Sequence, residues 1–176
     1  AVVTAFGMIF PKEVLEIPKY GFINIHPSLL PKYRGPTPIQ TAILNGDKET
    51  GVSLFLIDEE MDHGPILAKR ELEFPISNFQ FPILSQKLAE LGADLLIETL
   101  PDFVVGKITP LPHNESQATY TKKFSTQDVY IELKDLEEAQ EKGGDKAVEI
   151  DRKIRALNPE PGTFTLILSK GGLKRT

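Results

Sequence analysis

Alternating hydrophobic and polar residues predict a short β-strand over residues 22–26. Phe22, Asn24 and His26 fall on one face of that strand, and two isoleucines fall on the other. A proline-bounded turn follows at residues 27–31. Because ligands of open α/β sheets bind beyond the carboxyl ends of the strands, we expect Asn24 and His26 to face a site. A strand end whose polar groups are simply hydrogen-bonded would give the same pattern.

The preceding residues predict a β-α-β step. The apolar run 1–6 is typical of a buried strand, and Pro11 suits the first position of a short helix over residues 12–17. This step indicates an α/β fold with a mostly parallel sheet. Since a buried strand needs neighbours on both sides, we expect the chain to be a fragment whose first strands precede Ala1.

Two further strands and a helix are predicted downstream. The helix begins at about Pro38 and ends at Asn45-Gly46, a typical stop signal. Strands over residues 51–57 and 66–74 flank a loop at 58–65, in which four of eight residues are acidic. Such a loop indicates either a functional site or an exposed hairpin tip.

The clearest helix spans residues 83–103. Its apolar positions follow a helical period: Leu84, Leu88, Leu91, Leu95, Thr99 and Phe103. This stripe predicts core packing. The pattern then divides the chain into a first domain (1–106), a polar linker (107–124) and the start of a second domain (125–176). In the second domain we expect helices on either side of Gly143-Gly144, a strand at 163–168 and a truncated carboxyl end.

Composition narrows the classes of protein. The 176 residues are 40% hydrophobic and 26% charged, with a net charge of -5 and no cysteine. There is no disulfide or thiolate chemistry, no apolar run long enough for a membrane span and no signal peptide, so we expect a cytoplasmic globular protein. Residues 151–176 carry six basic and two acidic side chains. This cluster is either a solvated surface or a phosphate-facing patch.

Four motifs follow one another along the first half of the chain. They are Asn24-Ile25-His26-Pro27-Ser28-Leu29-Leu30-Pro31, Arg34-Gly35-x-x-Pro38-Ile39-Gln40, Gly46-Asp47-x-Glu49-Thr50-Gly51-Val52 and Met61-Asp62-x-Gly64-Pro65-Ile66-Leu67. Together they resemble the formyltransferase family that uses 10-formyltetrahydrofolate. The resemblance implies that residues 1–106 are the later part of a Rossmann-like catalytic domain.

Two later segments narrow the resemblance. Ala118-Thr119-Tyr120 with a following lysine, and Ile154-Arg155-Ala156-Leu157-Asn158-Pro159-x-Pro161-Gly162, are similar to the branch that formylates methionyl initiator tRNA. That branch implies a β-rich, OB-like tRNA-binding domain beginning at residue 125. The chain departs from the family pattern with His63 in place of threonine, Glu160 in place of an aromatic residue and Ile131-Glu132-Leu133 in place of Ile-Asp-Trp.

The resemblance implies that Asn24, His26 and Asp62 are catalytic. Formyl transfer between two nitrogens passes through a tetrahedral species with charge on the formyl oxygen. One fixed hydrogen-bond donor to such an oxygen contributes roughly 3–4 kcal/mol. The Asn24 amide and a protonated His26 would be such donors, while Asp62 would favour the imidazolium and relay a proton.

The resemblance also implies a site for the co-substrate. The pterin pocket would be lined by Phe6, Gly7, Met8, Ile9, Leu56, Ile57, Asp58, Glu59 and Glu60. The cleft would be shaped by Ser28, Leu29, Leu30 and Pro31, and Arg34-Gly35 would support the loop. No metal is expected, because His63 and His113 lie in a loop and the linker without metal-ligand spacing. Ser28 lacks the surroundings of a nucleophile.

The partners implied are initiator methionyl-tRNA and a folate, with no membrane and with the protein a monomer. A second reading keeps the chemistry but takes a small amine as acceptor, either glycinamide ribonucleotide or an amino-sugar nucleotide. The segments at 118–120 and 158–159 argue against it. A reading of another class is a non-catalytic folate- or RNA-binding protein on the same scaffold, against which the intact Asn24, His26 and Asp62 argue.

Overall fold

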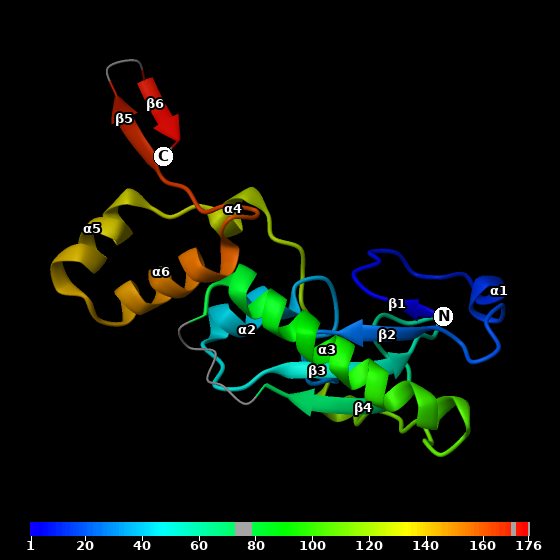
Figure 1. Cartoon of the computed structure of the whole chain (residues 1–176). Coiled ribbons are helices and arrows are strands. Elements are labelled where there is room, and N and C mark those ends of the chain that lie inside the picture. The colour runs from blue at the N-terminus through cyan, green and yellow to red at the C-terminus, as the bar shows by residue number, and fades with distance from the viewer. Residues whose placement is uncertain (73–78, 170–171, 176) are drawn as a thin grey trace.

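A mixed sheet of four strands organises the computed structural model, which describes residues 1–72, 79–169 and 172–175 (Figure 1). The strands lie in the order β1 (Val2–Val3), β2 (Ile23–His26), β3 (Gly51–Leu56) and β4 (Ile66–Glu71). β1 pairs with β2 in parallel, whereas β2 with β3 and β3 with β4 are antiparallel.

The α/β class and the parallel step through α1 (Lys12–Leu15) are confirmed. The expectation of a mostly parallel sheet is wrong for the described strands. β3 and β4 are consecutive and joined by a loop too short to hold a crossover helix, so they can pair only as antiparallel neighbours. Of the strand expected at 66–74, residues 73 and 74 lie outside the described part.

The first strand differs from its expectation in length and burial. β1 contains two residues instead of six, and the Val2 side chain is 45% exposed. Within the described part of the chain, β1 pairs only with β2. A continuous apolar run therefore did not predict a buried strand here.

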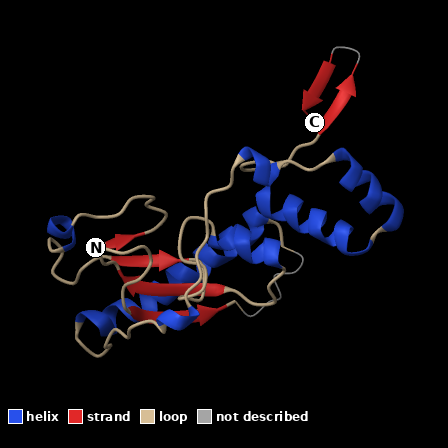
Figure 2. Cartoon of the chain, turned by 180° about the vertical axis from the view of Figure 1, so that it is seen from behind, coloured by secondary structure: helices blue, strands red, loops and turns tan. Residues whose placement is uncertain are grey.

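Helix α3 (Phe81–Val104) covers one face of the sheet (Figure 1). Its buried stripe is Leu84, Leu88, Gly92, Leu95 and Thr99, which confirms the predicted periodicity. α3 approaches β2 closely at Gly92, where an added Cβ would lie 2.6 Å from the Ile25 side chain. The isoleucines of β2 therefore pack under α3, and Asn24 and His26 face the other way. Loops, rather than a long helix, cross that second face (Figure 2).

The remaining helices are α2 (Pro38–Asn45), α4 (Thr126–Val129), α5 (Leu133–Lys142) and α6 (Gly144–Leu157), with a 3₁₀ turn η2 at Glu115–Gln117. α6 packs on α2, and Val129, Ala156 and Leu157 belong to the same core cluster as Ile39 and Ile43. The break at Gly143-Gly144 is confirmed, because Gly143 has φ +63° and α6 begins next to it. The division at residues 107 and 125 stays a prediction.

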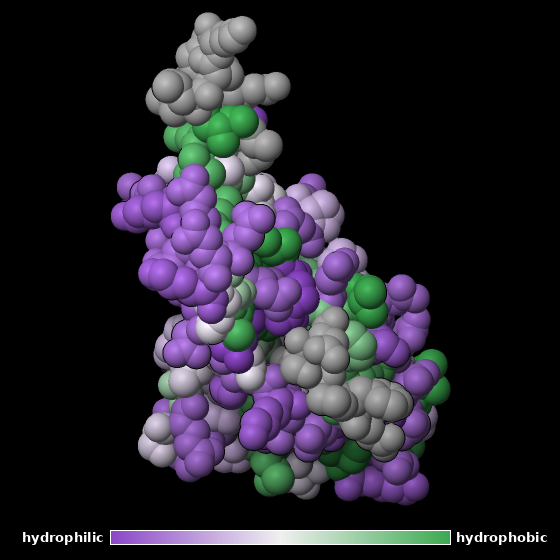
Figure 3. All heavy atoms as spheres, turned by 90° about the vertical axis from the view of Figure 1, so that its left-hand side faces the viewer, coloured by the Kyte–Doolittle hydropathy of each residue, from purple (hydrophilic) through white to green (hydrophobic). Residues whose placement is uncertain are grey.

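The carboxyl end forms a β-hairpin, β5 (Leu166–Ser169) and β6 (Gly172–Arg175), which stands away from the other elements (Figure 1). An OB-like domain start also stays a prediction. From the side of α5 and α6, hydrophilic residues cover most of the visible surface of these helices (Figure 3), and α5 has no buried residue. None of the helices in the described part is long and apolar enough to cross a membrane.

Candidate active site

Strand β2 carries two of the predicted site residues to its carboxyl end. The alternation places Asn24 and His26 on the face turned away from α3. His26 is 4% exposed, and its Nε2 lies 2.9 Å from the carbonyl oxygen of Tyr33. Because a carbonyl only accepts, Nε2 carries a proton and donates it there. The ring is thus oriented by the turn that follows its own strand.

The loop between β3 and β4 brings Asp62 to the same place. Asp62 Oδ2 lies 3.7 Å from His26 Nδ1 and accepts a 2.7 Å hydrogen bond from the backbone N–H of Gly35. Its backbone has φ +48°, a left-handed conformation that aspartate tolerates better than most residues. The juxtaposition of Asp62 and His26 expected from the resemblance is present.

The close approach of Gly64 to the end of β3 explains why the Met-Asp-x-Gly-Pro motif has a glycine. A Cβ on Gly64 would lie 1.8 Å from the carbonyl oxygen of Leu56, which is backbone and has no room to yield. The loop can therefore fold back against the end of β3 only with glycine at this position. This return also fixes where Asp62, two residues earlier, points.

The burial of His26 does not favour the imidazolium expected from the resemblance. Burial lowers the pKa of the imidazole, which outweighs the opposing effects of the Asp62 charge and the Tyr33 hydrogen bond. The lowered pKa favours the neutral ring over the imidazolium. With the proton on Nε2, Nδ1 is an unprotonated nitrogen facing a carboxylate.

A hollow of about 420 Å³ lies between α1 and the β3–β4 loop. It is lined by Lys12, Leu15, Glu16, Ile57, Asp58, Glu59, Glu60 and His63. Four of the predicted pterin-pocket residues line this hollow: Ile57, Asp58, Glu59 and Glu60. The sequence pattern gave no reason to include the residues from α1, because their contribution depends on how the helix folds back over the loop.

The other predicted pocket residues lie outside that hollow. Phe6 stacks on Phe10, and Phe10 on Phe22, with centroid distances of 4.7 Å, while Met8 and Ile9 are 70% and 62% exposed. Gly7 has open space around it. This aromatic stack stands on the same strand face as the site.

In the turn after β2, buried and partly buried residues alternate. Ser28 and Leu30 are each 1% exposed, and Ser28 Oγ donates a 2.6 Å hydrogen bond to the carbonyl of Lys32. Leu29 and Pro31 are only partly buried, as is Leu56 at the end of β3. Ser28 and Leu30 therefore shape the turn from inside.

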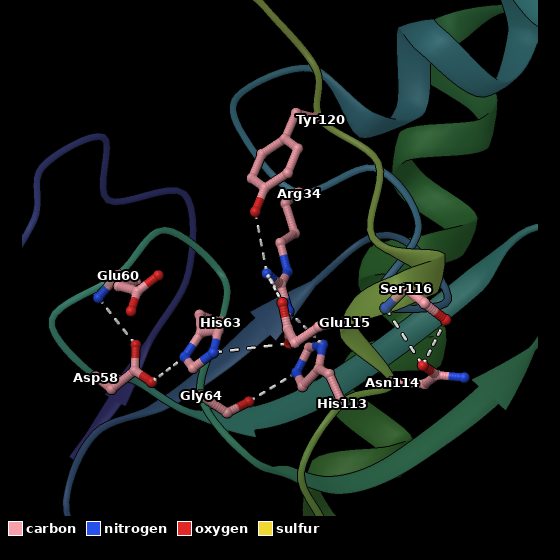
Figure 4. Close-up of polar contacts among 10 residues, drawn as sticks. All are labelled: Arg34, Asp58, Glu60, His63, Gly64, His113, Asn114, Glu115, Ser116 and Tyr120. Atoms are coloured by element: carbon pink, nitrogen blue, oxygen red, sulfur yellow. Dashed lines mark hydrogen bonds and ion pairs between the residues drawn. The ribbon is translucent and has the colours of Figure 1, made fainter.

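One group of polar residues was missed by the sequence interpretation. Arg34, expected only to support the loop, is 1% exposed, and its guanidinium contacts Glu115, His113 and Tyr120 (Figure 4). The Arg34-Gly35 motif pointed to the arginine. Its partners come from the linker, where composition indicated only irregular polar chain.

The segments that narrowed the resemblance have structural roles here. Thr119 accepts a hydrogen bond from the Tyr33 backbone, and Tyr120 forms a parallel bridge with Arg34. In α6, Arg155 donates to the carbonyl of Phe79 and to Asp151. Both segments hold the later part of the chain against residues from its first half.

The described residues contain no cluster of three or more histidine, cysteine or acidic side chains able to hold a metal ion. What the site offers is an amide, a buried imidazole and a carboxylate at the end of β2, next to an acidic, partly apolar hollow. This arrangement suits proton transfer and the stabilisation of a charged oxygen.

The fold and this grouping define an α/β protein with its site at a strand end. Comparison with known families identifies the family. The formyl transferase family model matches residues 1–100, and the chain belongs to this family. The matched range contains β2, the β3–β4 loop and all three residues of the grouping.

Similar proteins include two methionyl-tRNA formyltransferases. The one from Roseiflexus sp. (strain RS-1) is 47% identical over 165 residues, covering 94% of this chain and 47% of the relative. The one from Dictyoglomus turgidum is 44% identical over 169 residues, covering 96% of this chain and 50% of the relative. The chain therefore spans about half the length of the curated relatives that it matches.

Solved structures share the fold. HypX from Aquifex aeolicus, in complex with tetrahydrofolic acid, has a TM-score of 0.77 at 24% identity and covers 95% of this chain and 27% of HypX. A 4-N formyltransferase from Francisella tularensis has a TM-score of 0.77 at 22% identity, with 99% and 68% covered. At these identities the likeness establishes the α/β fold.

Proposed function

We propose that this chain is part of an enzyme that transfers the formyl group of 10-formyltetrahydrofolate to the α-amino group of methionyl initiator tRNA. The observation that carries the proposal is the 3.7 Å approach of Asp62 to the buried His26, beside Asn24 on β2. The chain's membership of the formyl transferase family and its 47% identity to a methionyl-tRNA formyltransferase support the same reaction and acceptor.

In the proposed mechanism, the amine nitrogen attacks the formyl carbon and the carbon–N10 bond of the folate then breaks. The Asn24 amide donates to the oxygen that becomes negative, a contribution of roughly 3–4 kcal/mol. His26, neutral with Nδ1 free, accepts the proton that the attacking amine loses. The Asp62 carboxylate stabilises the imidazolium that forms, and the proton passes on to the departing folate nitrogen.

The folate would lie along the hollow beside the β3–β4 loop. Tetrahydrofolic acid bound to HypX, a protein of the same fold, supports a folate as the donor. The aromatic stack of Phe6, Phe10 and Phe22 offers a flat apolar surface next to the site. The cytoplasmic location and monomeric state expected from the sequence stay predictions.

The acceptor is tested by formyl transfer with the full-length gene product. We expect rapid transfer to methionyl initiator tRNA and none to glycinamide ribonucleotide or an amino-sugar nucleotide. Binding of the tRNA, measured on filters at two salt concentrations, should weaken as salt rises, because phosphate contacts release counterions.

Two results would count against this proposal. Transfer to a small amine, with salt-insensitive tRNA binding, would support the small-amine reading. Folate and tRNA binding without any transfer would support a non-catalytic protein. The exposed charge variant Asp94→Asn on α3 should behave as the unaltered protein in every assay.

A further inference from the structure

One buried arginine, Arg34 in the segment that follows β2, binds the turn η2 (Glu115–Gln117). The Arg34 side chain is 1% exposed and donates two hydrogen bonds to the Glu115 carboxylate, at 2.9 and 2.7 Å. A buried guanidinium requires such a partner, and the paired geometry is the strongest that a carboxylate offers. Tyr120 accepts a further bond of 3.2 Å from Arg34. The arginine therefore fixes the turn in place.

His113 extends this contact to the loop that carries Asp62. Its Nδ1 accepts a 3.0 Å hydrogen bond from Arg34, and its Nε2 donates a 2.7 Å bond to the carbonyl of Gly64 (Figure 4). Because the guanidinium only donates, the proton of the neutral ring is on Nε2. One imidazole thus connects Arg34 to the residue two positions after Asp62.

His63 adds a second contact between the loop and the turn. His63 Nδ1 lies 2.6 Å from Asp58 Oδ2, and Nε2 lies 3.6 Å from Glu115 Oε1. The His63 ring also stacks on His113, with centroids 6.3 Å apart and planes 12° from parallel. The loop is therefore held by two neighbouring histidines, one on each side of the contact.

Asp62 itself is held by a backbone hydrogen bond. The backbone N–H of Gly35, adjacent to Arg34, donates to Asp62 Oδ2 at 2.7 Å. A residue with φ +48° keeps that conformation only when its surroundings determine it fully. The group formed by Arg34, His113 and Glu115 supplies part of those surroundings through its contacts with Gly64 and His63.

We propose that His113 and Glu115 are positioning residues: they hold the β3–β4 loop against the end of β2, so that Asp62 remains beside His26. This inference rests on the proposed formyl transfer for its catalytic consequence. Its geometric part concerns only where Asp62 lies, and it can be tested separately.

The test compares two substitutions of His113 in the full-length gene product. The amide of His113→Gln can still accept from Arg34 and donate to Gly64, whereas His113→Leu can do neither. We expect His113→Leu to lower kcat roughly ten- to a hundredfold, because small displacements of a catalytic group have effects of that size. His113→Gln should retain most of the activity.

The second readout is the NMR titration of the His26 ring, which a role in stability alone would not move. Asp62 raises the pKa of His26, so a displaced Asp62 should shift the titration of His26 to lower pH in His113→Leu but not in His113→Gln. Glu115→Gln should shift it in the same direction, and the exposed Asp94→Asn should not.

An unchanged His26 titration in both His113→Leu and Glu115→Gln would overturn the inference, as would equal loss of kcat in the leucine and glutamine variants. If the unaltered protein transfers no formyl group, the proposed function fails. The titration still decides whether the turn positions Asp62.

Discussion

At the scale of single residues, two effects compete at His26. Burial lowers its pKa, while the neighbouring Asp62 and the Tyr33 carbonyl raise it, and burial is the larger effect. A neutral imidazole that gains a proton next to a carboxylate is suited to accept a proton during the reaction. In the proposed mechanism His26 therefore starts in the form that can accept a proton, and Asp62 acts after the proton has arrived.

The two histidines beside the site respond to pH in opposite ways. A hydrogen bond to Asp58 raises the pKa of His63, with the charges of Glu60 and Glu115 acting in the same direction. Burial lowers the pKa of His113, as does the charge of Arg34. At a pH between the lowered pKa of His113 and the raised pKa of His63, His63 is protonated and His113 is neutral. This combination satisfies every bond between the turn η2 and the β3–β4 loop.

We predict opposite pH dependence for the stability lost in two variants. The stabilisation from His63 is complete below 6.5 and is lost as pH rises through its raised pKa. The loss caused by His63→Ala should therefore shrink at alkaline pH. The stabilisation from His113 is present above 6.5 and is lost as pH falls through its lowered pKa, so the loss caused by His113→Ala should shrink at acid pH.

Chemical denaturation across the pH range measures both losses as free energies of unfolding. Asp94→Asn provides the exposed reference. The same trend with pH for both histidines would contradict these assignments.

At the scale of elements, the contact between α3 and β2 sets the distance between the helix and the sheet. Gly92 allows it: an added Cβ would lie 2.6 Å from Ile25 Cγ2 and 3.3 Å from Val52 Cγ1. Both neighbours are β-branched and have few alternative rotamers. The position of β2, and with it that of His26, thus depends on the absence of a side chain at Gly92.

Gly92→Ala should lower the free energy of unfolding despite the better helix propensity of alanine. Crowding the core costs about 1–3 kcal/mol, whereas alanine gains about 1 kcal/mol over glycine in a helix. We expect a net loss of about 1 kcal/mol, measured by chemical denaturation. The neighbouring exposed change Ala93→Gly measures the propensity difference alone. A Gly92→Ala protein more stable than its parent would show that the contact is loose.

The helices and strands show which features of the fold can be predicted from the sequence. The periodicity of α3, the glycine break before α6 and the alternation in β2 were predictable, because each is a local pattern with a single structural solution. The antiparallel pairing of β2 with β3 was not, because the pattern within each strand does not determine which neighbour it takes or in which direction.

At the scale of the whole molecule, residues after position 106, including α6, pack against the residues before them. Leu111 and Ile66 exchange two backbone hydrogen bonds, and Leu157 is fully buried in the core that includes Tyr33. Basic residues of the carboxyl-terminal cluster bond within the chain: Lys153 to the carbonyl of Tyr130, for example. Contacts between residues so far apart in the sequence cannot be predicted from the composition of either segment.

The same distinction applies to the candidate site. Asn24, His26 and Asp62 were found because motifs mark them, and the structure brings His26 and Asp62 together. The partners of Arg34 were missed because His113 and Glu115 are some eighty positions away in sequence. The lowered pKa of His26 was not predicted, because burial cannot be read from the residues adjacent to it.

The most direct test of the central claim is a double-mutant cycle on His26 and Asp62, measured as kcat/KM for formyl transfer by the full-length gene product. If the two side chains work as one unit, each of His26→Ala and Asp62→Asn should lower kcat/KM by roughly 100-fold or more, and the double variant should be little worse than the poorer single. Fully additive losses, or an active His26→Ala protein, would contradict the account.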